Sequence, residues 1–345
     1  MGRSSRGSFI RALLGLAVGG GALYWLYRQL FNEKSKKRTP LEQDGAGDMS
    51  MPPVEAASGL LHRVAGMAVV PSVHRRPADV LINPSSNLDA EHLHKLIELL
   101  ETTDESSIRE QALVTLSNSA AFSVNQELIR NFGGIFIIGK LLSDPSPEVK
   151  VQALNALNNL GMNVRNQEQI KVYIGEICTD LDVAPLNSEL QLAALRVLTN
   201  MSVTNEYHGA MVQSTPCFLR VLAHGNENAQ IHVLKVLVNM SANRSVMEDL
   251  LHAQAPSSLA SFFDTCRNDD VLLRALTFVA NVNGNMVDEE SAAGHRQYPE
   301  GSLFSVLFGA SKQKMQKLTP FLQHQDQDVK RQIARILTTV DIVEE

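Results

Sequence analysis

The chain has 345 residues, and 44% of them are hydrophobic, which is enough apolar material to fill a folded core and to exclude wholesale disorder. The net charge of -6 is unevenly spread, because residues 1–40 hold eight Lys and Arg against one acid, Glu33. The rest of the chain is therefore strongly acidic and would repel phosphate backbones, which argues against nucleic acid as a partner.

The first predicted element is a single membrane-spanning helix near the N-terminus. Residues 12–27 carry no charge, and at a rise of about 1.5 Å per residue they span roughly 24 Å of a hydrocarbon core about 30 Å thick. A cleaved secretory signal would need a small-residue cleavage site, whereas Tyr24, Trp25 and Tyr27 stand there as an aromatic belt. The predicted anchor consists of Ala12, Leu13, Leu14, Leu16, Val18, Leu23, Tyr24, Trp25, Leu26 and Tyr27.

The flanks of this helix predict its orientation and its membrane. Within the anchor segment, residues 1–38, basic residues lie on both sides with a small excess after the helix, so the positive-inside rule favours a cytosolic C-terminal body. The short, glycine-interrupted helix suits the mitochondrial outer membrane better than the thicker plasma membrane, and the endoplasmic reticulum membrane stays open as an alternative. The basic run at residues 34–38 has the composition of a nuclear import signal, but beside an anchor we interpret it as a lipid-facing cluster.

Residues 39–87 are predicted to be a flexible linker. They are rich in Pro, Gly, Ser and Ala, and their six prolines prevent a long helix. An apolar stretch at residues 60–70 is too short to cross a membrane, and we leave its role unassigned.

A repeat with a period of about 40 residues follows the linker, which is typical of stacked helical units. Five segments share the pattern Ala-Leu-x-x-Leu-x-Asn, with Val replacing Ala or the second Leu once each, and their asparagines are 41, 41, 39 and 42 residues apart. A sixth copy, residues 333–339, ends in Thr after a longer interval, as expected of a terminal repeat. The five full copies are residues 112–118, 153–159, 194–200, 233–239 and 275–281.

Each copy is predicted to be the later helix of at least a helix pair. Apolar residues at helical spacing precede the copies, as at residues 93–100, 137–142 and 259–263. Helix start signals lie between the two helices: Ser146 can cap, Pro147 can take the first helical position, and Glu148 favours the helix N-terminus.

The segment from residue 133 to residue 160 resembles the armadillo repeat. The consensus turn, the Leu-Leu helix end, the acidic-Pro stretch and the final motif stand here as Gly133-Gly134-Ile135, Leu141-Leu142, residues 144–147 and residues 153–160. The resemblance covers about residues 88–345 and implies an all-α fold, a right-handed superhelical solenoid of about six repeats.

The amino-acid sequences of residues 120–135 and 153–174, together with the N-terminal anchor, are similar to those of the X-linked armadillo-repeat family of mitochondrial proteins. That resemblance implies a scaffold on the mitochondrial outer membrane that regulates mitochondrial distribution, transport and dynamics. It also implies mitochondrial Rho GTPases and kinesin trafficking adaptors as partners. The alternative function is a regulator of cell growth and survival that sequesters a transcription factor.

The resemblance further implies that the asparagine of each repeat hydrogen-bonds the backbone of an extended peptide. A side-chain amide can hydrogen-bond the backbone of a peptide of any sequence, or it can hydrogen-bond the neighbouring repeat of its own chain. Both interpretations stay open. The predicted groove asparagines are Asn118, Asn159, Asn200, Asn239 and Asn281.

One helical turn before each of these asparagines, importin-like armadillo proteins carry Trp. This chain has no Trp at those positions. It has Val114, Asn155, Arg196, Lys235 and Thr277, which argues against the binding of nuclear import signals. Arg196 and Lys235 fall in adjacent repeats, so we add them to the predicted groove and expect an acidic partner segment.

Motifs for chemistry are missing from the sequence. No phosphate loop, nucleophile elbow or zinc spacing occurs, so we expect no enzyme, cofactor or metal. His92 and His94 point in nearly opposite directions on a helix and are predicted to be surface residues. The three cysteines have no Cys-x-x-Cys spacing, which fits a reducing compartment.

Overall fold

The computed structural model of the chain describes residues 88–290, 297–309 and 318–343. These residues form two compact units, which we call unit 1 (residues 88–170) and unit 2 (the described residues from 171 onward). The predicted anchor, the linker and the apolar stretch at residues 60–70 lie outside the described residues. Among the helices that the structure does describe, none has both the length and the apolar character needed to cross a bilayer.

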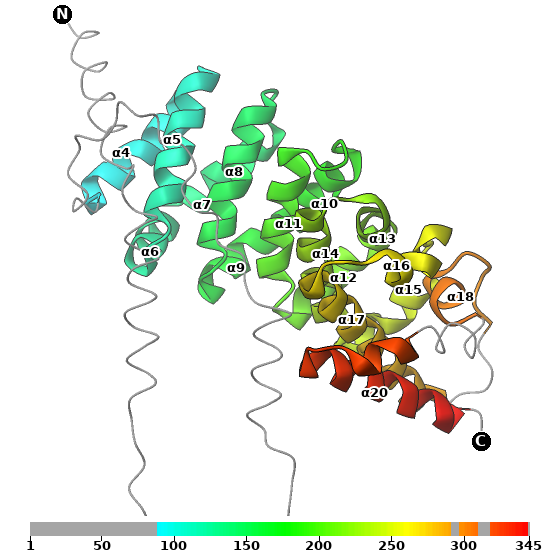
Figure 1. Cartoon of the computed structure of the whole chain (residues 1–345). Helices are drawn as coiled ribbons and strands as arrows, with labels where there is room; N and C mark the ends of the chain where they lie inside the picture. The colour runs from blue at the N-terminus through cyan, green and yellow to red at the C-terminus, as the bar shows by residue number, and fades with distance from the viewer. Residues whose placement is uncertain (1–87, 291–296, 310–317, 344–345) are drawn as a thin grey trace, which may run out of the picture. The chain divides into compact units, whose positions relative to one another are not determined.

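The described part of unit 1 is all-helical and combines longer helices with short ones (Figure 1). Its elements are α4 (Ala90–Thr102), α5 (Ser106–Ser119), α6 (Ser123–Asn131), α7 (Gly134–Lys140), η1 (Leu141–Ser143), α8 (Pro147–Leu160) and α9 (Val164–Ile170).

Unit 2 continues the same order of elements. They are η2 (Lys171–Tyr173), α10 (Ile174–Val183), α11 (Glu189–Met201), η3 (Asn205–Tyr207), α12 (His208–Met211), η4 (Val212–Ser214), α13 (Thr215–His224), α14 (Glu227–Ser241), η5 (Arg244–Val246), α15 (Met247–His252), η6 (Ser257–Ser261), α16 (Phe262–Thr265), α17 (Asp269–Glu290), α18 (Leu303–Phe308), η7 (Thr319–Gln323) and α20 (Gln327–Val343).

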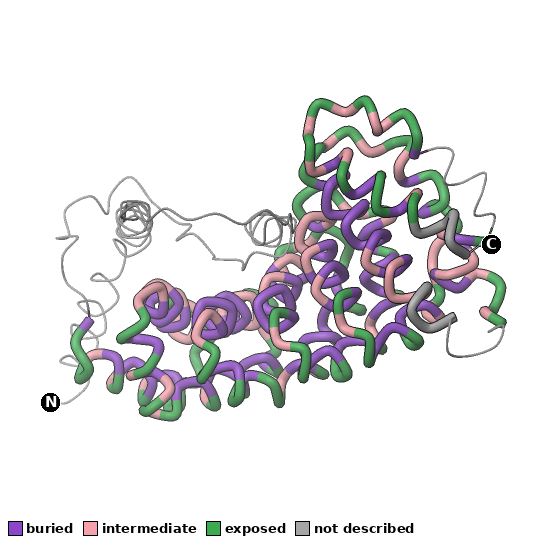
Figure 2. Tube along the Cα trace, turned by 90° about the horizontal axis from the view of Figure 1, so that it is seen from below, coloured by how far each residue is buried: buried purple, intermediate pink, exposed green. Residues whose placement is uncertain are grey.

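The repeat motif lies on a helix in every copy, as the period predicts. We call α5 and α8 in unit 1, and α11, α14, α17 and α20 in unit 2, the motif helices. In the first copy Ala112, Leu113 and Leu116 are fully buried, and the other full copies repeat this burial. Burying one such leucine stabilises the fold by about 1.5–3 kcal/mol, so the motif positions are the core of each unit. Figure 2 shows buried residues along the helices and exposed residues on many of the connecting loops.

The predicted helix start before α8 is confirmed. Ser146 is the N-cap residue, and its hydroxyl oxygen accepts a hydrogen bond from the Val149 N–H at 3.4 Å. Pro147 occupies the first helical position, and the Ser146 hydroxyl also donates to the Glu148 carboxylate at 2.9 Å. The helix therefore begins where its sequence offers a cap, a preset φ and a favourable charge.

The predicted turn at Gly133-Gly134 is also confirmed. Gly133 precedes α7 with a φ of 74°, a left-handed conformation that favours glycine. Gly134 is packed so closely that a Cβ atom there would lie 2.7 Å from Ile129 Cγ2 and 2.9 Å from Ile97 Cδ1. Glycine at these two positions lets the chain turn from α6 into α7 with close packing against Ile129 and Ile97.

Short helices follow the motif helices, so the repeats contain more than the helix pair that was the predicted minimum. In unit 1, α6 and α9 begin with buried Asn-Gln pairs whose side chains cap the preceding motif helix. Asn125 Nδ2 donates to the Ser119 carbonyl at 3.0 Å and Gln126 Nε2 to the Ala120 carbonyl at 2.8 Å. Asn166 and Gln167 repeat both bonds on Leu160 and Gly161, which satisfies carbonyls that a helix end leaves without partners.

The end of unit 2 departs from the regular period. After α17 the chain returns to α15, where the Ala255 N–H donates to the Gly301 carbonyl at 2.9 Å and the Leu303 N–H to the Ala253 carbonyl at 2.8 Å. The motif copy on α20 is atypical as expected, because Ile333 is fully buried while Ala334 is exposed.

Candidate functional site

Five of the six motif helices carry one predicted groove asparagine each, and α20 carries Thr339 at that position. In unit 1, α5 packs against α8. In unit 2, α11 packs against α14, α14 against α17, and α17 against α20, an order visible in Figure 1. The predicted residues Asn118 and Asn159 therefore belong to unit 1, while Asn200, Asn239 and Asn281 belong to unit 2.

In unit 1, Asn159 on α8 hydrogen-bonds α5, the motif helix that precedes it. Asn159 is only 3% exposed, and its Nδ2 donates to the Ser117 carbonyl at 3.0 Å and to the Ser117 hydroxyl at 3.2 Å. Asn118, on α5, is half-buried.

Unit 2 repeats this arrangement. Asn239 Nδ2 donates to the Ser202 hydroxyl at 2.9 Å, and Asn281 Nδ2 to the Ser241 hydroxyl at 3.2 Å. The side-chain oxygen of Asn281 accepts from Arg335 Nη1 at 3.0 Å, and Asn200 is fully buried. The structure thus provides the contacts of the second interpretation raised by the sequence, in which the asparagines join neighbouring repeats. Their binding of a peptide stays a prediction.

The two predicted cations lie at the same level of adjacent motif helices in unit 2. Arg196 on α11 and Lys235 on α14 are both half-buried, one turn before the asparagines of their helices. The structure adds two residues one further turn back that the sequence reading missed: His232 on α14 and Arg274 on α17, the latter 7% exposed. We call these four side chains the cationic cluster.

The side chains of the cationic cluster influence one another electrostatically. Burial lowers the pKa of His232 to about 3, and the charges of Lys235, Arg196 and Arg274 lower it as well. Burial also lowers the pKa of Lys235, with help from Arg274 and against the attraction of Asp270. The His232 imidazole is therefore neutral near pH 7, and the charges of three cations disfavour its protonation. The Thr199 hydroxyl lies 3.5 Å from His232 Nδ1 and fixes the ring against α11.

The corresponding positions in unit 1 carry no charge. Val114 is half-buried on α5, and Asn155 on α8 is 9% exposed with its Nδ2 donating to Gln152 Oε1 at 3.3 Å. The cationic character is therefore a property of unit 2.

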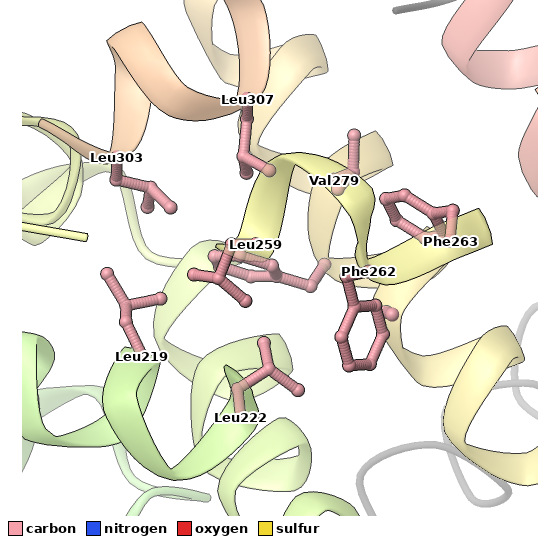
Figure 3. Close-up of a pocket in the computed structure, with 10 residues that line it drawn as sticks. Leu219, Leu222, Leu259, Phe262, Phe263, Val279, Leu303 and Leu307 are labelled. Atoms are coloured by element: carbon pink, nitrogen blue, oxygen red, sulfur yellow. The ribbon is translucent and has the colours of Figure 1, made fainter. Parts of the chain in front are cut away.

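A small apolar cavity lies elsewhere in unit 2, where α13, α16, α17 and α18 meet (Figure 3). Its volume is about 20 Å³, room for about one water molecule. Its lining is entirely apolar: Leu219, Leu222, Leu259, Phe262, Phe263, Ala275, Phe278, Val279, Leu303 and Leu307. It lacks the size and the polar groups of a small-molecule site.

The described residues contain no set of three or more His, Cys, Asp or Glu able to hold an ion. His92 Nδ1 lies 2.7 Å from Asp89 Oδ1, while the exposed His94 ring meets Phe132 edge-on with centroids 5.0 Å apart. The two histidines therefore have separate partners. Burial raises the pKa of the Cys178 thiol and raises that of Cys217 to about 11, so neither is a reactive thiolate near pH 7.

Comparison with known proteins matches this architecture. A family model described as Armadillo-like matches residues 88–308. An engineered protein of known structure is 20% identical, with a TM-score of 0.59 over 72% of this chain and 96% of that chain. A designed armadillo repeat protein solved in complex with the peptide (KR)4 is 19% identical, with a TM-score of 0.58 over 72% of this chain and 98% of that chain.

Computationally designed armadillo repeat proteins for modular peptide recognition give 19% identity and a TM-score of 0.58, over 72% of this chain and 99% of that chain. At such identities these structures show the fold alone, while the family model spans more than half of the chain. The chain therefore belongs to the Armadillo-like repeat family, and it has the all-helical armadillo-repeat solenoid fold of a protein-binding scaffold.

Proposed function

We propose that this chain is a non-enzymatic scaffold that holds an acidic segment of a partner protein on the motif helices of unit 2. The observation that carries the proposal is the half-buried pair Arg196 and Lys235 on adjacent motif helices, backed by Arg274. Cations in a low-dielectric environment attract carboxylates more strongly than cations in water. One of the similar structures holds a peptide of Lys and Arg, whereas this face carries positive charge itself and would repel such a peptide.

We further propose that the scaffold acts on the mitochondrial outer membrane, with the endoplasmic reticulum membrane as the alternative. The uncharged residues 12–27 with basic flanks support an anchor, and the resemblance to the X-linked armadillo-repeat family supports mitochondria. On that membrane the partners would be mitochondrial Rho GTPases and kinesin trafficking adaptors, and the function would be the control of mitochondrial distribution, transport and dynamics.

Proximity labelling from the intact chain in cells tests the partner proposal. Wild type is compared with the double variant Arg196→Glu and Lys235→Glu, and with a control in which the exposed Lys140 and Lys171 become Glu. The control changes the net charge equally and leaves α11 and α14 intact. The proposal expects labelling of Rho GTPases and kinesin adaptors to be lost only in the first variant, and equal labelling in all three proteins would contradict it.

Imaging after deletion of residues 1–30 tests the location. A diffuse distribution of the shortened chain is the expected result. Mitochondrial retention without these residues would contradict the anchor, and a nuclear protein would favour the growth regulator that sequesters a transcription factor.

A further inference from the structure

The loop between η1 and α8 contains Ser146 followed by Pro147, the pair that proline-directed protein kinases phosphorylate. The described residues hold two other pairs of this type, Thr215-Pro216 and Thr319-Pro320. A kinase of this class binds the residues around the hydroxyl in an extended conformation and brings the hydroxyl to the γ-phosphate of ATP. Backbone conformation and exposure therefore decide which of the three pairs can react in the folded chain.

Of these three pairs, Ser146 alone meets both conditions. Its backbone is extended, with φ -82° and ψ 120°, and it is half-buried between two exposed prolines. Thr215 is fully buried in the first turn of α13, where its hydroxyl donates to the carbonyl three residues before it at 2.6 Å. Thr319 is exposed, but it is the first residue of the helix η7, so its backbone is helical.

The Ser146 hydroxyl is held only by its own helix turn. Its oxygen accepts from the Val149 N–H at 3.4 Å, a long hydrogen bond, and it donates to the exposed Glu148 carboxylate at 2.9 Å. In the kinase an aspartate takes the hydroxyl proton. The bond between Ser146 Oγ and the γ-phosphorus of ATP forms, the bond from that phosphorus to the bridging oxygen breaks, and ADP leaves.

The loop that carries Ser146 also holds the ion pair between α8 and α5. Asp144 Oδ1 accepts the Ser146 N–H at 2.9 Å, while Asp144 Oδ2 lies 2.8 Å from Arg109 Nη1 of α5. The Asp144 side chain is 1% exposed, so this carboxylate depends on its two partners for stabilisation. A new charge on Ser146 would enter beside it.

We propose that Ser146 is a phosphorylation site for a proline-directed kinase, and that its phosphate loosens the junction between α5 and α8. A phosphoserine carries about two negative charges at pH 7. The N-terminus of α8 attracts them, but the carboxylates of Asp144 and Glu148 repel them, and Asp144 is buried. The phosphate also competes with Asp144 for Arg109. Phosphorylation of this loop would thus regulate the packing of two neighbouring repeats.

The modification is tested with the full chain in detergent, Mg²⁺-ATP and a set of cyclin-dependent and MAP kinases, followed by peptide mass spectrometry. Phosphate is expected at Ser146 and not at the buried Thr215 of the folded chain. Pro147→Ala, which keeps the hydroxyl and removes the proline, should lose the modification. Absence of phosphate from Ser146 with every kinase, or equal modification of Pro147→Ala, would overturn the assignment of the site.

The consequence is tested by hydrogen exchange of the phosphorylated and unmodified chains. Amides of α5 and of the first turn of α8 are expected to exchange about fivefold faster after phosphorylation, the effect that loss of a helix cap produces. Glu148→Gln removes one of the two repelling carboxylates and should reduce this acceleration, whereas Glu206→Gln, at an exposed position of unit 2, should not. Unchanged or slower exchange after phosphorylation would overturn the loosening, and an equal acceleration in Glu148→Gln would overturn repulsion as its cause.

Discussion

The side-chain amide of Asn159 donates a hydrogen bond to the backbone carbonyl of Ser117 at 3.0 Å, and so joins α8 to the end of α5. In unit 2, Asn239 and Asn281 also donate to the preceding repeat, but to the hydroxyl groups of Ser202 and Ser241, which stand two residues after the asparagine of that repeat. The recurring asparagine thus joins neighbouring repeats through polar contacts, which are buried at Asn159 and part-buried at Asn239 and Asn281. Buried contacts of this kind are costly to leave unsatisfied.

Asn159→Ala is expected to destabilise unit 1 by about 1–3 kcal/mol, because it leaves the buried Ser117 groups without this donor. Hydrogen exchange of the α5 and α8 amides measures the local opening free energy. Asn118→Ala, at a half-buried position, serves as the control and should have a smaller effect. A larger loss at Asn118 than at Asn159 would contradict this role of the asparagine.

Arg109 and Asp144 form an ion pair between the repeats of unit 1. Arg109 Nη1 lies 2.8 Å from Asp144 Oδ2, and the Asp144 side chain is 1% exposed. Arg109→Met leaves the buried Asp144 carboxylate without its charge partner and should lower the free energy of unfolding by about 3 kcal/mol. Adding Asp144→Leu should recover most of this loss. Urea denaturation of the two single variants and the double variant measures the coupling. If the loss of the double variant equals the sum of the two single losses, the interaction between Arg109 and Asp144 contributes nothing to stability.

Gly134→Ala should destabilise the junction of α6 and α7, because its Cβ atom would lie 2.9 Å from the Ile129 carbonyl oxygen, a backbone atom that cannot rotate away. Gly133→Ala meets no atom within 4 Å, so its cost is only the left-handed φ, about 1 kcal/mol. Thermal melts of both variants should therefore rank Gly134→Ala as the more damaging. The opposite ranking would mean that backbone strain outweighs packing at this turn.

Unit 2 is expected to lose stability in mild acid. Burial lowers the pKa of His208, and burial with three neighbouring cations lowers that of His232 to about 3. The unfolded chain protonates both rings below about pH 6.5, whereas the lowered pKa of each ring disfavours its protonation in the folded chain. The stabilisation is therefore complete above pH 6.5 and declines as the pH falls, for His232 until about pH 3. For His232 the loss between pH 7 and pH 5 is about 1–2 kcal/mol.

The His232 contribution is measured by urea denaturation of wild type and His232→Gln at pH 7 and pH 5. The wild type should lose more stability over this interval than the variant. The exposed His224→Gln should behave as wild type does. An identical pH dependence in His232→Gln and wild type would rule out His232 as the source.

The helices and their register were predictable because the motif fixes them locally. Burial of Ala112, Leu113 and Leu116, the Ser146 cap and the Gly133 turn all follow from residue types at fixed spacing. Whether the asparagines bind a peptide or a neighbouring repeat was not predictable, since an amide serves both purposes, and the choice depends on where Ser117 lies in three dimensions.

Two residues of the candidate site and one part of the fold could not be predicted from the sequence. Arg274 and His232 lie two turns before the asparagines, and only the packing of α11, α14 and α17 brings them to Arg196 and Lys235. The return of the chain to α15 after α17 uses backbone bonds between distant segments, and no side-chain pattern encodes these.

We expect α11, α14 and α17 to form the surface that receives an acidic segment. Hydrogen exchange of the full chain with and without an extended, glutamate-rich peptide tests this most directly. The predicted result is slower exchange in these three helices, lost in Arg196→Glu with Lys235→Glu and kept in Lys140→Glu with Lys171→Glu. Protection confined to other helices, or protection that persists in the charge-reversed face, would contradict the account.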